Sequence, residues 1–276
     1  MGAQNRPMTL RLTRWGHSCV RFDDERRHLV VDPGAFSRLD DALAGAQAIL
    51  VTHEHADHLA VETVADAVRG GVPLWGPAPV VALLRDAGAP QERLHVVSGG
   101  DHVEAAGFQV RVLGAWHAVI HPDIPRIPNV AYLVAGVLHP GDAHVQPTDA
   151  PDVLLLPISG PWFSLTDAVD RARDIGARRI VPIHDGLLND RGLGLLHTLV
   201  GRLVRDSELV VLTAGESLEL AHPGGDVMTG THPDLPPHAD EIPLLEQDET
   251  IPPRPEEEVA DVARAVPDPL GHGGGQ

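Results

Sequence analysis

The stretch Thr52–Leu59 reads THEHADHL, and the interpretation of the whole chain starts from it. It places three histidines and one aspartate within six residues, after the apolar run 48–51 and before a helical pattern over 59–68. A strand that ends in a loop and then leads into a helix would bring these four side chains to one strand end. Imidazole and carboxylate groups are ligands for Zn²⁺, and also for Mn²⁺ or Fe. The stretch therefore predicts a metal site, and the alternative is a surface loop with solvated histidines.

Four ligand side chains so close in the sequence rarely serve one ion. His53 and His55, two residues apart, could bind one ion, whereas Asp57 and His58, at the start of the helix, could bind a second. Each ion then needs further ligands, so we expect more His and Asp side chains at the ends of other strands.

The pattern His-x-His-x-Asp-His after an apolar strand resembles the metallo-β-lactamase superfamily. Further short motifs occur in the order found in its UlaG-like branch, which includes the ascorbate-6-phosphate lactonases. The resemblance covers about residues 8–220 and implies the α/β metallo-β-lactamase fold, an αββα sandwich of two mixed sheets flanked by helices. The further motifs are Trp15-Gly16-His17-Ser18, Val31-Asp32-Pro33, Trp116-His117, Gly141-Asp142 and Pro182-Ile183-His184.

The resemblance also implies which side chains bind the two ions. His117 would complete the first set, with His121 as its competitor. Asp142 would bridge both ions, although the chain has Gly-Asp-Ala where the family usually has Gly-Asp-Thr. His184 would be the last ligand of the second ion, and the alternative is a histidine that only closes a turn. The full implied set is His53, His55, Asp57, His58, His117, Asp142 and His184.

Five polar residues in or near these motifs have further roles or alternative roles. The resemblance implies that Asp57 is catalytic as well as a ligand, because its carboxylate can orient the nucleophile or accept its proton. His17 is predicted at the rim of the pocket, as a donor to substrate or as a structural histidine in a turn. Asp32 is implied to lie behind the ligands, or else to form a turn. His139 and His144 flank Asp142 and are predicted to support it or to lie on the surface.

Hydrophobic periodicity predicts alternating strands and helices around these motifs. One long strand is expected over 129–138, leading to Asp142, and Ser164 or Thr166 is expected to cap a helix. The other predicted strands cover 9–13, 19–22, 28–31, 48–51, 72–75, 94–97, 107–113, 153–157, 179–183 and 208–212, and the other predicted helices cover 61–68, 79–87 and 193–204.

The composition limits the classes of function. With 276 residues, 43% of them hydrophobic, the chain can bury one large core. Its net charge of −18 and the lack of a basic run argue against nucleic acid as a partner. The single cysteine, Cys19, excludes an internal disulfide. No apolar run approaches about 18 residues, so we expect no membrane span and a cytoplasmic protein. The sequence leaves the oligomeric state open.

The last part of the chain has a different composition. Residues 222–276 hold 12 Asp and Glu against 2 Arg, together with ten prolines. Such a segment buries too little apolar surface to fold alone. We therefore predict a hydrolase domain over 1–221 and an acidic, largely disordered tail over 222–276.

The predicted function is a metal-dependent hydrolase. A hydroxide activated by two divalent ions, with Zn²⁺ as the first choice, would attack a small ester, lactone or phosphoester. One alternative is an iron-dependent dioxygenase or redox protein of the same fold, and another is a metal-bound scaffold without catalysis. Metal analysis would separate the hydrolase from the dioxygenase, since one iron per chain would count against hydrolysis.

Overall fold

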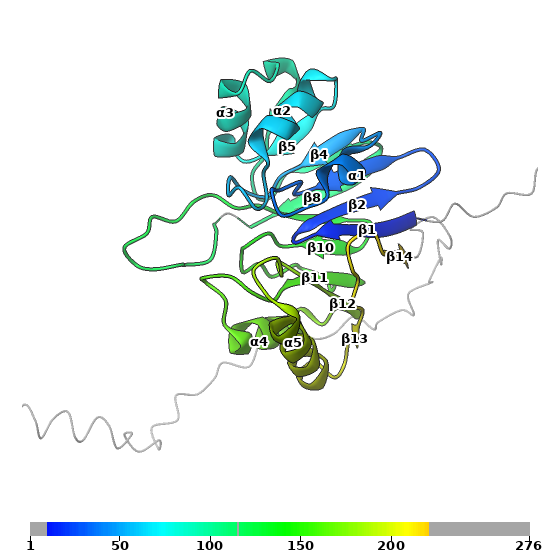
Figure 1. The fold of residues 1–276 in the computed structure, drawn as a ribbon, viewed down its shortest axis with the longest axis vertical. Helices are drawn as coiled ribbons and strands as arrows, with labels where there is room; N and C mark the ends of the chain where they lie inside the picture. The colour runs from blue at the N-terminus through cyan, green and yellow to red at the C-terminus, as the bar shows by residue number, and fades with distance from the viewer. Residues whose placement is uncertain (1–9, 115, 221–276) are drawn as a thin grey trace, which may run out of the picture. The chain divides into compact units, whose positions relative to one another are not determined.

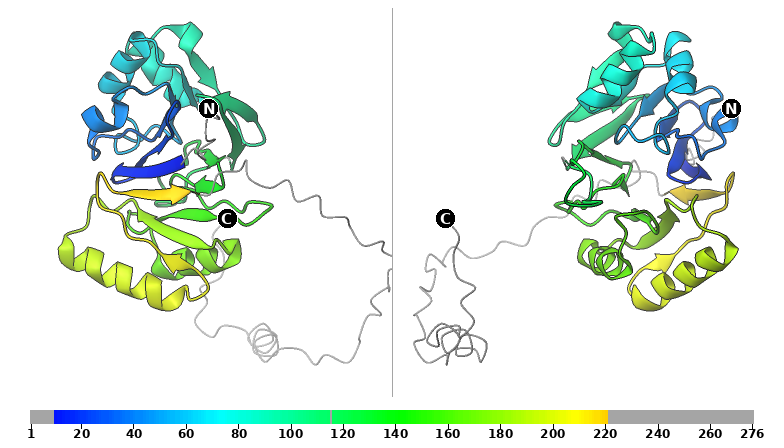
Figure 2. Two further views of the ribbon diagram at one scale, coloured as in Figure 1. Left: turned by 90° about the vertical axis from the view of Figure 1, so that its right-hand side faces the viewer. Right: turned by 60° about the vertical axis from the view of Figure 1, so that its left-hand side comes forward.

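Two mixed sheets pack face to face and carry helices on their outer faces (Figures 1 and 2). The computed structural model describes residues 10–114 and 116–220, so the predicted acidic tail lies outside the described residues. The architecture is the αββα sandwich that the sequence predicted. In the described part of the chain, no helix is long and apolar enough to cross a membrane.

The first sheet, called sheet A, is built mainly from the N-terminal half of the chain. Helices α1 (Leu39–Leu43), α2 (Val61–Arg69) and α3 (Ala78–Asp86) accompany it, and a short 3₁₀ turn, η1 (Gln91–Arg93), precedes its last strand. The strand order is β14 (Ser217–Leu220), β1 (Leu10–Gly16), β2 (Cys19–Asp23), β3 (His28–Val31), β4 (Ala48–Leu50), β5 (Leu74–Gly76) and β6 (Leu94–Val96).

The second sheet, sheet B, follows from the C-terminal half. Its outer face carries α4 (Leu165–Ile175) and α5 (Asp190–Leu203). The strand order is β13 (Glu208–Leu209), β12 (Arg179–Ile183), β11 (Val153–Pro157), β10 (Val137–His139), β9 (Ala131–Val134), β8 (Phe108–Leu113) and β7 (His102–Ala105).

The alternation of side chains along each strand explains the layers. In β4, Ala48 and Leu50 face the core between the sheets, while Ile49 faces the helices of sheet A. In β11, Val153 and Leu155 face the same central core, and Leu154 and Leu156 face α4. Strands that are apolar on both faces therefore have both faces covered.

Several predicted elements have different boundaries in the structure. The single strand predicted over 129–138 is wrong: it is a hairpin of β9 and β10, because Ala135 and Gly136 adopt positive φ angles of 47° and 78°. Two successive left-handed residues make the tight turn that joins twisted antiparallel strands. The strand predicted over 208–212 shortens to β13. Helix α1 and strands β7 and β14 were not predicted, and β14 closes sheet A beside β1.

A hydrogen bond joins the two sheets directly before the THEHADHL stretch. The hydroxyl of Tyr132 in β9 donates to the carbonyl oxygen of Val51 at 2.9 Å, and the whole side chain is buried. This contact holds the end of β4 against sheet B, where the stretch begins.

We expect Tyr132→Phe to destabilise the protein by about 1–2 kcal/mol, because it leaves the buried Val51 carbonyl without its donor and removes little volume. Urea unfolding measures this as a lower midpoint at unchanged slope. Tyr132→Leu, which also removes the ring, should lose more. An unchanged midpoint for Tyr132→Phe would show that the hydroxyl does not stabilise the junction.

Candidate metal centre

The ends of strands from both sheets meet at one edge of the sandwich. In sheet A, β3 and β4 are parallel and end beside Asp32 and the THEHADHL stretch. In sheet B, β8, β10 and β12 run in one direction, since β9 is antiparallel to both β8 and β10, and β10, β11 and β12 are parallel. These three strands lead to His117, Asp142 and His184. The topology therefore gathers groups that lie up to 131 positions apart in the chain.

Three of the predicted ligands of the first ion lie beside Asp142. The Nε2 atom of His53 is 3.1 Å from Nδ1 of His55 and 3.8 Å from Oδ2 of Asp142. The Nε2 atom of His117 is 3.3 Å from the same oxygen. All four ligand atoms lie within 4.8 Å of one another. The structure thus brings together His53, His55, His117 and Asp142, as the resemblance implied.

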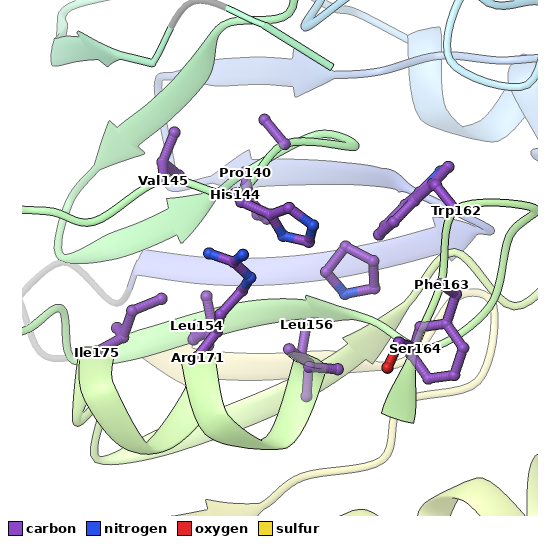
Figure 3. Close-up of a pocket in the computed structure, with 13 residues that line it drawn as sticks. Pro140, His144, Val145, Leu154, Leu156, Trp162, Phe163, Ser164, Arg171 and Ile175 are labelled. Carbon is purple, nitrogen blue, oxygen red and sulfur yellow. The ribbon is translucent and has the colours of Figure 1, made fainter. Parts of the chain in front are cut away.

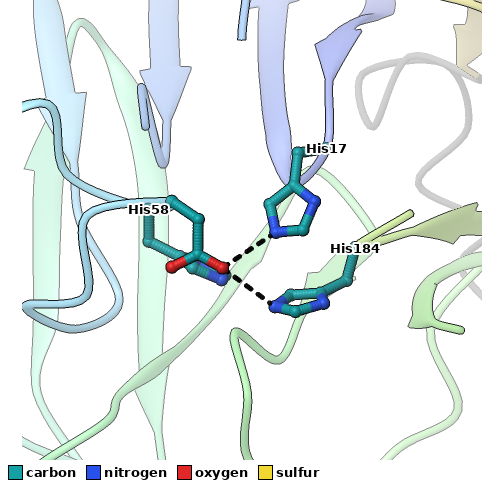
Figure 4. Close-up of side chains that lie close together, drawn as sticks. His17, His58 and His184 are labelled. Atoms are coloured by element: carbon teal, nitrogen blue, oxygen red, sulfur yellow. Dashed lines mark hydrogen bonds and ion pairs between the residues drawn. The ribbon is translucent and has the colours of Figure 1, made fainter. Parts of the chain in front are cut away.

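The predicted ligands of the second ion form another group. His58, His184 and Asp57 lie with His17 so that four ligand atoms fall within 4.8 Å of one another. The rings of His17 and His184 turn toward the same carboxylate oxygen (Figure 4). Their Nε2 atoms lie 3.1 and 3.5 Å from Oδ2 of Asp57. His58 lies beside this pair.

Asp142 joins the two groups. Its Oδ1 atom is 3.2 Å from Nε2 of His58, and its Oδ2 atom is 3.0 Å from Nε2 of His184. The same Oδ2 atom faces His53 and His117 in the first group. A buried carboxylate with imidazoles on both sides is placed to bind two ions at once.

The second nitrogen of three imidazoles fixes the proton positions. Nδ1 of His58 lies 2.7 Å from Oδ2 of Asp32, and Nδ1 of His117 lies 2.6 Å from the carbonyl oxygen of Ala118. Both oxygens can only accept, so each Nδ1 carries a proton. Nδ1 of His53 faces the hydroxyl of Thr52, whose own hydrogen goes to Asp32. In the neutral form of all three rings, the form that binds metal, Nε2 therefore has a lone pair for an ion at the centre.

The buried donor set fits divalent metal ions. The Nε2 atoms of His58, His117 and His184 and the Oδ1 atom of Asp142 are buried, and they have no hydrogen-bond partner among the described residues. Unpaired polar atoms in the interior are costly, and cations would satisfy all of them together.

The charges at the centre also call for cations. Burial opposes the charge on Asp142, but the neighbouring imidazoles, that of His58 first, hold its pKa well below the ordinary range. Burial likewise opposes a charged His58, yet the carboxylates of Asp142 and Asp32 raise its pKa well above the ordinary value. His184 behaves in the same way, because the nearby carboxylates of Asp142 and Asp57 outweigh burial and raise its pKa to about 9. Protons thus occupy the places where metal ions would neutralise the carboxylates.

His17 differs from the other histidines in its proton position. Its Nδ1 atom accepts the backbone N–H of Gly186 at 2.9 Å, so the proton of the neutral ring is on Nε2. That Nε2–H donates to Oδ2 of Asp57. His17 therefore has no lone pair to offer an ion, although it lies within the second group. Its position makes it a donor that orients Asp57.

Asp32 organises the loop behind the ligands. It is fully buried, and its carboxylate accepts the backbone N–H and the hydroxyl of Thr52 and the Nδ1–H of His58, each at 2.7 Å. The chain just after it packs closely on the stretch, since a Cβ atom on Gly34 would lie 1.7 Å from the carbonyl oxygen of Asp57. These contacts give Asp32 the place that the resemblance implied.

Three residues of the centre have left-handed backbones. The φ angles are 47° at His17, 51° at Asp32 and 59° at His184. Non-glycine residues adopt such angles at a cost, and Asp and His tolerate them better than most. Among the described residues, the two other non-glycine cases are Ala106 and Ala135, each in a tight hairpin turn.

The remaining histidines near the motifs lie outside the two groups. The side chain of His121 is 60% exposed and faces Asp123, whereas His117 lies in the first group. His139 is buried and donates from Nε2 to the carbonyl oxygen of Ser18 at 2.8 Å. His144 is exposed and packs edge-on against Trp162.

Two side chains support Asp142 in a way that the sequence did not indicate. The indole Nε1–H of Trp162 donates to Oδ2 of Asp142 at 3.0 Å, and Oδ1 of Asn129 accepts the backbone N–H of Asp142 at the same distance. Trp162 lies outside the motifs on which the resemblance rests. In the sequence, the only indication of a role for Asn129 is its position directly before an apolar run.

Comparison with known proteins identifies the family. A family model described as a beta-lactamase superfamily domain matches residues 11–184. The chain belongs to the metallo-β-lactamase superfamily. It is 37% identical over 202 residues to Protein Rv0786c of Mycobacterium tuberculosis, covering 70% of this chain and 91% of that protein.

Two further similarities concern the branch and the fold. A probable L-ascorbate-6-phosphate lactonase UlaG of Salmonella heidelberg is 30% identical over 135 residues, covering 42% of this chain and 36% of that protein. The structure of Igni18, a metallo hydrolase from the archaeon Ignicoccus hospitalis, superposes with a TM-score of 0.60 at 20% identity, covering 77% of this chain and 99% of that chain. The UlaG-like resemblance and the fold class are confirmed.

We expect Asp32→Asn to weaken metal binding by about 10–100-fold, because the amide can donate where the carboxylate only accepted from His58. Asparagine tolerates the left-handed backbone, so the fold should persist. Competition with a chromogenic chelator measures the affinity. Asp24→Asn, another buried carboxylate in sheet A's β2–β3 turn, is the control and should bind metal as the native protein does. Equal affinity in Asp32→Asn would show that Asp32 does not position His58.

His17→Gln should keep both ions, since His17 offers no lone pair, whereas His184→Ala should lose one. Elemental analysis after dialysis measures the ions per chain. Loss of an ion from His17→Gln would show that His17 is a ligand and that its proton is not on Nε2.

Proposed function

We propose that this protein is a metal-dependent hydrolase that acts on a small ester, lactone or phosphoester at two divalent cations. One observation carries the proposal: two groups of ligand atoms, each within 4.8 Å, meet at the buried carboxylate of Asp142. A single metal site would not need a second set of buried, unpaired imidazole nitrogens beside the first.

Each group has an assigned set of residues. His53, His55 and His117 would hold one ion. Asp57, His58 and His184 would hold the other, and Asp142 would bind both ions. When bound, such a pair of cations lowers the pKa of a water molecule and stabilises negative charge on the attacked substrate oxygen. No serine or cysteine nucleophile is needed for this chemistry, and the one cysteine, Cys19, is buried in sheet A with a raised thiol pKa.

Asp57 is proposed to act on the reacting groups, and His17 is proposed to position Asp57. Burial opposes the charge on Asp57, but its hydrogen bonds to His17 and His184 hold its pKa far below the ordinary value, so it is a carboxylate at neutral pH. A carboxylate there can accept a hydrogen bond from the attacking water and orient it. The Nε2–H of His17 keeps that carboxylate turned toward the centre.

The comparisons support hydrolysis in general terms. One relative is named a lactonase and one solved neighbour a metallo hydrolase, and these names belong to those proteins. The donor set of imidazoles and carboxylates suits Zn²⁺, with Mn²⁺ or Fe as alternatives. A small-molecule substrate agrees with the acidic chain, whose net charge of −18 disfavours nucleic acid.

The test begins with the metal content of the purified protein. The ions are removed with a chelator and replaced one metal at a time, and a panel of small lactones, esters and phosphoesters is assayed for turnover. We expect about two ions per chain and turnover that is lost with the ions and returns with them. One iron per chain together with oxygen consumption would favour the dioxygenase alternative. Two retained ions without turnover on any substrate would favour the scaffold.

Asp142→Ala should abolish turnover and weaken the binding of both ions, because both groups lose their shared carboxylate. Calorimetric metal titration and the best substrate of the panel measure the two effects. Asp86→Ala, which removes an exposed carboxylate from α3, is the control and should change neither. Normal activity with two ions in Asp142→Ala would contradict the bridging role.

A further inference from the structure

A hollow beside the metal centre has mostly apolar walls. It lies between β11, α4 and the loops over 140–145 and 157–164, and the centres of water-sized molecules can occupy about 40 Å³ of it. Leu154 and Leu156 of β11 and Ile175 of α4 line it (Figure 3), and so does Ala168 of α4. A compact hydrocarbon group would be removed from water there.

Trp162 separates this hollow from the predicted metal ligands. One part of its ring lines the hollow, while its Nε1–H donates to Asp142. Its ring centroid lies 6.0 Å from that of His117 and 5.7 Å from that of His184. A molecule that fills the hollow would therefore lie one indole ring away from the reacting centre.

Arg171 brings a positive charge into the hollow. It extends from α4 toward His144 (Figure 3), and its Nε atom is buried without a hydrogen-bond partner in the described part of the chain. No carboxylate of residues 10–114 or 116–220 forms an ion pair with it, although the protein has 39 acidic residues against 21 basic ones. A partly buried guanidinium without an anion is costly, and a ligand carboxylate would satisfy it with paired hydrogen bonds.

A second arginine near the centre has a different role. Arg126 lines another hollow, with His55 and His117, but its Nε–H donates to the carbonyl oxygen of His117 at 2.9 Å. It therefore supports a predicted ligand loop. Arg171, by contrast, lines its hollow with a buried Nε atom that has no hydrogen-bond partner among the described residues.

We propose that the hollow binds the non-reacting part of the substrate, a compact hydrocarbon group that carries a carboxylate, with the carboxylate held by Arg171. The bond to be hydrolysed then extends past Trp162 to the metal centre. The planar guanidinium can hold a carboxylate through two parallel hydrogen bonds. This inference rests on the proposed hydrolase function and names its substrate class.

Calorimetric titration of the metal-loaded protein with hexanoate tests the proposal. Acetate carries the charge without the hydrocarbon, and hexanol carries the hydrocarbon without the charge. We expect hexanoate to bind about tenfold more tightly than either. Acetate or hexanol binding as tightly as hexanoate would overturn the proposal.

Variants locate the binding. Arg171→Gln should weaken hexanoate about tenfold and leave hexanol unchanged, and Ala168→Leu, which narrows the hollow, should weaken both. Arg173→Gln makes the same charge change two residues away on α4, where the side chain is half exposed and pairs with Asp170, and it should leave hexanoate binding unchanged. Metal content and thermal midpoint are compared across all variants.

The outcomes separate this proposal from the hydrolase function. Equal hexanoate affinity in the native protein and in both hollow variants would mean that the carboxylate binds at the ions, and the proposal would fail. If the affinities follow the expected pattern but no ester, lactone or phosphoester is turned over, the hollow is a carboxylate site and the proposed hydrolase function is wrong.

Discussion

The attraction between one buried carboxylate and the imidazoles around it is the interaction on which this centre depends. Asp142 faces His53 and His58 from sheet A and His117 and His184 from sheet B, so the two sheets can meet at this edge only if those charges are balanced. Desolvation disfavours every charged group there, and the opposite charges compensate. The pKa values of His58 and His184 move upward for this reason.

The hydrogen bonds behind the centre fix which nitrogen of each imidazole carries the proton, even without a bound ion. Asp32 accepts a hydrogen bond from the Nδ1–H group of His58, and the Ala118 carbonyl accepts one from that of His117. In each neutral ring, Nε2 then carries the lone pair and faces the centre. The backbone N–H of Gly186 imposes the opposite tautomer on His17. Side chains of one residue type thus divide into ligands and a donor, and the division follows from backbone and carboxylate partners at the rim of the centre.

Much of the fold could be predicted from the sequence, because strands such as β11 and β12 are short apolar runs with clear ends. The THEHADHL stretch indicated the centre by its composition alone, whereas His117, Asp142 and His184 needed the resemblance, since isolated His and Asp residues carry no spacing signal. The hairpin of β9 and β10 was missed because Ala135 lies in an apolar run and Gly136 alone does not reveal a turn. Trp162, Asn129 and Arg171 were missed because their importance lies in contacts across the fold, which no local pattern encodes.

The residues with positive φ angles indicate where substitutions could raise the thermal stability of this protein. At His17, Asp32 and His184 the strained conformation presents a side chain that the centre uses, so relief by glycine there would remove the group along with the strain. Ala106 and Ala135 have the same geometry in β-hairpins, and their methyl groups have no part in the centre. Glycine at these two turns would relax the chain without touching the metal ligands, so engineering for heat tolerance has a natural starting point there.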